Sequence, residues 1–203
     1  MSDATKIQSL SEDIAFIRTM VEEGRRTPYR GEISLAAGLI WGTASLCIWA
    51  AHAGLWIPPG GVESASWAWL AALVVGAAAG FALRDFRRRH TNRVAAAAWG
   101  AVGLAIGAMS MAVMIAAGRT HEPVIFALLP PMIMALYGGG WLVGAVAFRA
   151  PWQRWIGGLC LLSSLALAYT AAQPVEYLLF ALSLYGLAAF PGLVAVLRPH
   201  RNA

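Results

Sequence analysis

The feature that most constrains the fold is a series of apolar runs, each about 20 residues long, separated by short polar segments. An α-helix of about 20 apolar residues is long enough to cross a hydrocarbon core of roughly 30 Å. The sequence therefore predicts an all-α fold, a polytopic membrane helix bundle with six transmembrane helices. The runs cover residues 33–56, 65–83, 94–117, 123–148, 152–172 and 175–197.

Charged residues are scarce and lie mainly outside the runs. They make up 12% of the chain, whereas about 25% is usual in a soluble domain. The net charge of +5 does not indicate nucleic-acid binding, because the basic residues flank the runs and do not form a patch interleaved with aromatic residues. Of the 15 Lys and Arg residues, all but Arg119 fall on one side of the predicted topology. The positive-inside rule then predicts a multi-pass protein of a bacterial-type inner (plasma) membrane with both termini in the cytoplasm.

Three regions are expected along the chain: a cytoplasmic amphipathic arm (1–31), a six-helix transmembrane domain (32–198) and a cytoplasmic tail (199–203). Within the arm, Ser9 and Glu12 have the spacing of a helix capping box. The helix that follows has an apolar face, which we expect to contact either lipid or a partner protein. That face consists of Leu10, Ile14, Ile17 and Val21.

Two clusters of arginine border the first two runs. Each basic residue near a membrane surface contributes about 1 kcal/mol of attraction to anionic lipids. We therefore expect contacts with the lipid bilayer, and with anionic lipids at its cytoplasmic face. A membrane-protein partner or a homo-oligomer is the other expected contact. The clusters contain Arg25, Arg26 and Arg30, and then Arg87, Arg88 and Arg89.

Prolines within two of the runs predict helix kinks. Pro130 and Pro131 lie in the fourth run and Pro191 lies in the sixth. Proline lacks the backbone N–H and clashes with the carbonyl of the preceding turn, so a helix bends or breaks there. Broken helices line the sites of some transporters, but a purely structural kink is the more common outcome.

Small and aromatic residues give further expectations about packing. Glycine pairs four residues apart allow helices to approach closely in lipid, and they predict a compact bundle. These pairs are Gly38 with Gly42, Gly76 with Gly80, and Gly103 with Gly107. Tryptophans near the ends of the runs are expected at the headgroup boundary. They are Trp56, Trp67, Trp69, Trp152 and Trp155.

The predicted outer loops carry carboxylates and imidazoles at similar depth. Such groups could bind zinc or another divalent ion if they converged. Solvated loop residues are the favoured interpretation, because no short spacing forces them together. We therefore expect no metal and no cofactor. The residues of this candidate outer-face site are His52, Glu63, His121, Glu122 and Glu176.

The interior of the predicted spans is uncharged, which argues against ion-coupled transport. No phosphate-binding loop, HExxH helix or GxSxG elbow occurs, so an enzyme is not expected. The sequence favours an accessory, regulatory or scaffold subunit that acts through its arm and its helix bundle. The alternative is a passive channel or facilitator for a small neutral solute, formed by one chain or by a homo-oligomer.

Overall fold

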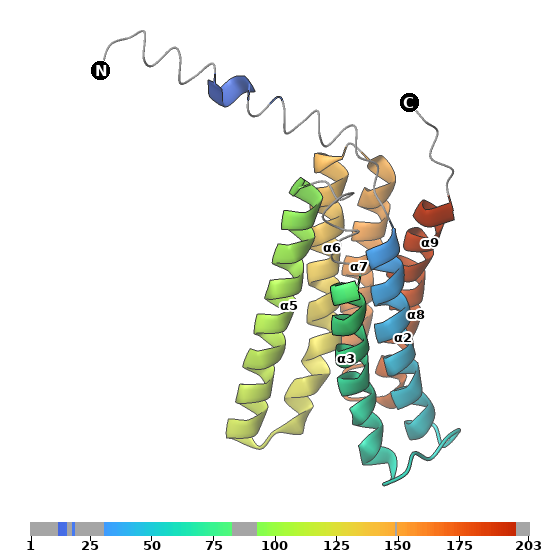
Figure 1. Ribbon diagram of the computed structural model, residues 1–203. Coiled ribbons are helices and arrows are strands. Elements are labelled where there is room, and N and C mark those ends of the chain that lie inside the picture. The colour runs from blue at the N-terminus through green and yellow to red at the C-terminus, as the bar shows by residue number, and fades with distance from the viewer. Residues whose placement is uncertain (1–11, 16–17, 19–30, 83–92, 149, 198–203) are drawn as a thin grey trace.

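In the computed structural model, residues 12–15, 18, 31–82, 93–148 and 150–197 are described, and all regular structure within them is helical. The long helices run side by side in alternating directions (Figure 1). The first half contains α2 (Glu32–His52), η1 (Val62–Ser66), α3 (Trp67–Ala82) and α5 (Arg93–Thr120). The second half contains η2 (Pro123–Leu128), α6 (Leu129–Ala147), α7 (Pro151–Tyr169), α8 (Pro174–Leu184), η3 (Tyr185–Ala189) and α9 (Phe190–Leu197).

Five helical segments of the described chain are long and apolar enough to cross a membrane, which indicates a membrane protein. They are Glu32–His52, Val62–Ala82, Ala97–Thr120, Val124–Ala147 and Pro174–Leu197. The predicted bundle of apolar helices is thus confirmed, but the count of six is not. The helix outside this set is α7, whose first turn contains the polar residues Gln153 and Arg154. Those two residues lower the hydropathy of an otherwise apolar helix.

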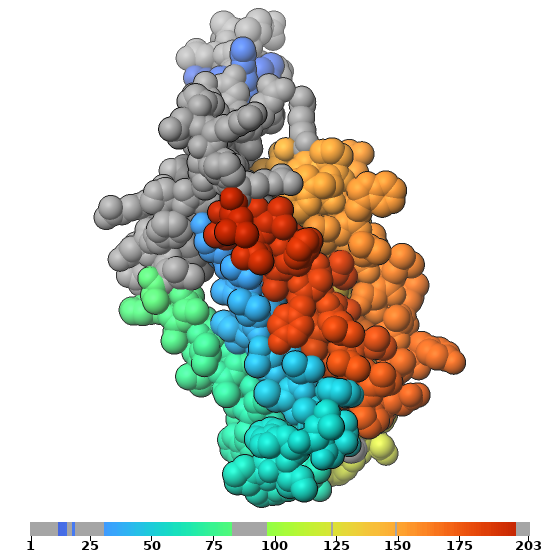
Figure 2. Space-filling view, turned by 90° about the vertical axis from the view of Figure 1, so that its right-hand side faces the viewer, coloured from blue at the N-terminus to red at the C-terminus, as the bar shows by residue number. Residues whose placement is uncertain are grey.

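Helix α2 packs tightly against the last helical segment of the described chain. In Figure 2, α9 lies directly against α2 along the face shown. A Cβ atom at Gly38 would lie 2.4 Å from the backbone nitrogen of Ala189, and one at Gly192 would lie 2.5 Å from that of Leu35. These distances are too short for any side chain, so glycine is required on both helices. Of the three predicted glycine pairs, only Gly38 with Gly42 lies in close contact with another helix, because a Cβ atom in the other two pairs would meet no atom within 4 Å.

The helix before Pro191 widens into a π-helical turn, η3. The N–H of Phe190 donates to the carbonyl of Tyr185, five residues earlier. The hydroxyl of Ser34 on α2 donates to the carbonyl of Ala188 at 2.9 Å. A proline leaves backbone carbonyls of the preceding turn without their helical donor. The hydroxyl of Ser34 thus adds a side-chain donor from the neighbouring helix to the turn that precedes Pro191.

Substitution of Ser34 by alanine should lower the stability of the bundle modestly. Hydrogen bonds between membrane helices contribute about 0.6 kcal/mol on average, so we expect a loss of about 0.5–1 kcal/mol. Unfolding of the purified protein by SDS in mixed micelles would measure it. The control is Ser66→Ala, because the hydroxyl of Ser66 is exposed and bonds only to Glu63 in its own turn. Equal midpoints for the two variants would contradict a role for the Ser34 bond.

Aromatic side chains fill the centre of the bundle. Trp141 on α6 has 0% of its surface exposed. Its ring lies 5.3 Å from that of Trp99, edge to face, and 5.7 Å from that of Trp152. On the α2 side, Trp69 lies 5.4 Å from Trp41 and 6.0 Å from Phe180. Edge-to-face and tilted pairs at 4.5–7 Å are favourable packing arrangements. Trp69 and Trp152, which the sequence predicts at the headgroup boundary, are partly buried and pack against this core.

Candidate functional site

The three carboxylates expected on the outer face have different surroundings. Glu63 lies in η1 and Glu122 precedes η2, and both are exposed. Glu176 is the third residue of α8 and only 1% of its surface is exposed. The expectation of a solvated loop residue therefore describes Glu63 and Glu122 but not Glu176, which lies inside the last apolar segment.

The carboxylate of Glu176 holds the turn between α7 and α8. Its Oε2 atom accepts the backbone N–H of Ala172 at 2.9 Å. Ala172 has a φ of +65°, a conformation that costs energy for a residue with a side chain. The other oxygen, Oε1, is buried and has no hydrogen-bond partner among the described residues. The carboxyl group also lies at the amino end of α8, where the helix dipole favours its ionised form.

His52 and Tyr177 connect the end of α2 to the start of α8, next to Glu176. The two rings stack with centroids 5.6 Å apart. Nδ1 of His52 lies 2.9 Å from the carbonyl oxygen of Ile48. A carbonyl can only accept, so Nδ1 carries a proton and donates it to this bond. Ile48, Ala51 and Ala65 form a small buried cluster at this end of the bundle, against which Tyr177 packs.

The five predicted outer-face residues do not form a metal site. Among the described residues there is no group of three or more His, Cys, Asp or Glu side chains that could hold a metal ion. His121 and Glu122 follow α5, whose main packing partners are α6 and η2, whereas His52 and Glu176 lie at the ends of α2 and α8. The chain therefore brings His52 close to Tyr177. The other predicted outer-face residues lie at two separate places in the bundle.

The serines of α7 and the tandem prolines form one packing arrangement. Pro130 and Pro131 occupy the first turn of α6, where the 3-10 helix η2 ends. The hydroxyl of Ser164 donates to the carbonyl oxygen of Pro131 at 2.7 Å. Ser163 and Ser183 form a hydrogen bond that joins α7 to α8. No local pattern predicts these partners, because the residues of each pair are at least 20 positions apart in the sequence.

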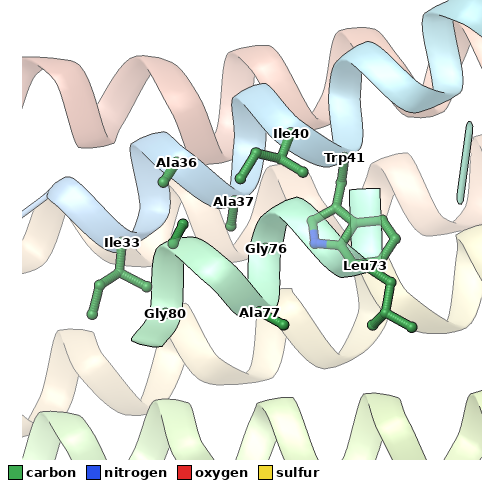
Figure 3. Close-up of a pocket in the computed structure, with 10 residues that line it drawn as sticks. Ile33, Ala36, Ala37, Ile40, Trp41, Leu73, Gly76, Ala77 and Gly80 are labelled. Atoms are coloured by element: carbon green, nitrogen blue, oxygen red, sulfur yellow. The ribbon is translucent and has the colours of Figure 1, made fainter. Parts of the chain in front are cut away.

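An apolar groove lies between α2 and α3 (Figure 3). Its volume is about 250 Å³, and every residue that lines it is apolar. Gly76 and Gly80 of α3 face Ala36 and Ala37 of α2, and Trp41 lies at one end. The sequence identified Gly76 and Gly80 only as a helix-packing pair. The groove itself depends on how far apart the two helices lie, which no local pattern specifies.

Most residues of the predicted arm and of the arginine clusters lie outside the described residues. This applies to Leu10, Ile17, Val21, Arg25, Arg26, Arg30, Arg87, Arg88 and Arg89. The described part of the arm contains Ile14, which is helical and exposed. The amphipathic arm and its lipid contacts therefore remain predictions.

No family model, curated protein or solved structure matches this chain. Any function must therefore be argued from the residues and their geometry.

Proposed function

We propose that the chain is an accessory or scaffold subunit of a bacterial-type inner membrane, which acts through its outer surfaces and its amino-terminal arm. The observation that carries this proposal is that buried and partly buried hydroxyl groups of the bundle form hydrogen bonds that hold its helices. Buried Ser34 and the partly buried Ser164 and Ser183 all form hydrogen bonds between or within helices. Among the described residues, only Gln153 and Glu176 keep a buried side-chain oxygen without a hydrogen-bond partner.

We include α7 as a sixth crossing in this proposal. It packs along α6 at close range, since a Cβ atom at Gly138 would lie 3.0 Å from the carbonyl oxygen of Gly157. With six crossings, the first residue of α2 and the last residue of α9 lie on the same side of the membrane. In Figure 1, α5 and α7 begin at the end of the bundle where α2 begins and α9 ends. Arg93 is the first residue of α5 and Arg154 lies in the first turn of α7, whereas Arg119 lies in the last turn of α5. This distribution supports cytoplasmic termini under the positive-inside rule.

The outer surfaces offered to a partner belong mainly to α3 and α5. Only 11% of each of their apolar segments is buried, compared with 33% for that of α2. On α5, a Cβ atom at Gly103 or Gly107 would meet no other atom within 4 Å. Paired small residues on a membrane helix favour close approach of another helix. The uncovered α5 face therefore supports a membrane-protein partner or a second copy of the chain.

Affinity purification from native membranes tests the proposal. We expect a defined set of proteins to purify with the full chain, and part of that set to be lost when residues 1–24 are removed or when Gly103 is replaced by leucine. Gly158→Leu on α7 is the matched control, because a Cβ atom there also meets open space. If the full chain recovers only what an unrelated membrane protein of similar size recovers, the proposal fails.

The alternative of a neutral-solute channel has less support. Trp141, Phe180, Met134 and Leu167 fill the centre of the single chain. A solute would therefore have to pass between copies of a homo-oligomer. Flux of small neutral solutes into liposomes that contain the protein, above that of empty vesicles, would favour this alternative over the accessory role.

A further inference from the structure

The loop that joins α2 to α3 exposes large apolar side chains at one end of the bundle. This hairpin loop, residues 53–66, includes η1 and forms the lower end of the face shown in Figure 2. Its single charged side chain is that of Glu63. Ile57 has 73% of its surface exposed, whereas the following residue, Pro58, is buried and seats the loop on the bundle. The exposed large apolar residues of the hairpin loop are Leu55, Trp56, Ile57 and Val62.

The lengths of the two membrane segments place the ends of the hairpin loop at the edge of the hydrocarbon core. The segments Glu32–His52 and Val62–Ala82 each contain 21 residues. An α-helix of that length spans about 30 Å, which is the thickness of the core. A shift of α2 and α3 towards the loop side would draw the charge of Glu32, the first residue of α2, into the core. The loop therefore begins and ends at the level of the lipid headgroups.

The backbone of the hairpin loop bonds internally, as a segment close to hydrocarbon must. The N–H groups of Gly54 and Leu55 donate to carbonyl oxygens in the last turn of α2, at 3.1 and 2.9 Å. The N–H of Gly61 donates to the carbonyl oxygen of Pro58 at 3.0 Å, and the hydroxyl of Ser64 donates to that of Gly61 at 2.7 Å. Unsatisfied backbone groups are costly where water is scarce. These bonds lower the cost of placing the loop against lipid.

The apolar surface of the hairpin loop continues onto α3. Trp67, Leu70 and Val74 follow one another at three- and four-residue spacing, and all three are exposed. Residues with that spacing lie on one face of a helix. Only 11% of the membrane segment Val62–Ala82 is buried inside the bundle, so this face is available to acyl chains. The loop residues extend the same lipid-facing surface into the headgroup region.

We infer that the hairpin loop is an interfacial anchor, which inserts Trp56 and its apolar neighbours into the leaflet at that end of the bundle. Tryptophan and aliphatic side chains are favoured at the boundary between headgroups and acyl chains. The turn between α5 and η2 differs, because it carries Arg119, His121 and Glu122 within four consecutive positions. That turn should lie in water. The partner of the hairpin loop is thus the bilayer itself, and the anchor fixes the depth of α2 and α3.

Electron paramagnetic resonance of a nitroxide label tests the anchor. Labels are attached to Ile57→Cys and, as the control, to Glu122→Cys, in a Cys47→Ala background that leaves the buried Cys160 in place. Both labelled positions are exposed, so the fold of the described chain shields neither label. The proteins are reconstituted alone into phosphatidylcholine liposomes. We expect the label at position 57 to collide more often with oxygen, which concentrates in hydrocarbon, than with a water-soluble nickel chelate. The label at position 122 should show the reverse.

A label at position 57 that collides mainly with the nickel chelate, as the control label does, overturns the inference. Leu55→Cys, a second exposed position of the loop, repeats the measurement if the first variant does not elute as a single folded species. A water-exposed label in liposomes, combined with protection of position 57 from a membrane-impermeant maleimide in native membranes, also overturns it. In that case a second protein, absent from the liposomes, covers the loop. The liposome measurement needs no partner protein, so its outcome is independent of the accessory role.

Discussion

Replacement of Gly38 by leucine is expected to separate α2 from the last helical segment and to abolish the folded bundle. Even a Cβ atom at this position would lie 2.4 Å from the backbone nitrogen of Ala189 and 2.8 Å from the carbonyl oxygen of Leu184. Both neighbours are backbone atoms, so neither can rotate away. Overpacking of a dense interior costs about 1–3 kcal/mol, and a larger cost is expected where backbone must move. We expect a loss of about 3 kcal/mol or more.

The measurement is the SDS fraction at the unfolding midpoint, with yield after size-exclusion chromatography as a second readout. Gly103→Leu on α5 is the control, because the added side chain meets open space. Leucine is the better helix former by about 1 kcal/mol, so this control should be neutral or stabilising. A Gly38→Leu protein as stable as the control would mean that α2 does not pack against η3 as described.

The coarse fold follows from the sequence because span length and turn residues are local properties. The apolar run of 175–197 coincides closely with α8 to α9, and the loop with Pro58 and Pro59 lies outside any helix of the described chain. The boundaries are less accurate. The first helix ends at His52 rather than at residue 56, and α5 continues through Gly118 and Arg119 to Thr120. Backbone conformation decides these ends, since Gly54 and His121 have positive φ values.

The contacts between helices could not be predicted in the same way. Glycine pairs with the same spacing have different roles: Gly38 lies against backbone, whereas Gly76 borders a groove and Gly103 faces open space. Nothing local to the three pairs separates these outcomes, because they depend on which helix lies opposite. Trp152 illustrates the same limit. Its place near the end of a run suggested a headgroup position, but its neighbour Trp141 lies on α6 and only tertiary structure brings them together.

Glu176 is buried, whereas the sequence predicts a solvated loop residue. Its substitution separates two roles of the carboxylate, as the acceptor of the Ala172 N–H and as a negative charge. In Glu176→Ala the N–H of Ala172 loses its acceptor and the buried side chain leaves a cavity. A hydrogen bond contributes about 0.5–1.5 kcal/mol and the cavity adds to its loss, so we expect a loss of about 1–3 kcal/mol in the SDS unfolding experiment. The turn between α7 and α8 should also become more sensitive to proteolysis, because it positions Ala172 at a positive φ.

Glu176→Gln should behave differently, because glutamine keeps an acceptor for Ala172 and removes a charge from a buried position. The second oxygen of Glu176 has no partner among the described residues, and an unpaired buried charge is destabilising. Stability equal to or above that of the wild type is therefore the expected result. If Gln and Ala destabilise the protein equally, the negative charge itself is required, as attraction to the amino end of α8 would require. The bond to Ala172 would then be secondary, and the free oxygen would be part of a site that needs the carboxylate.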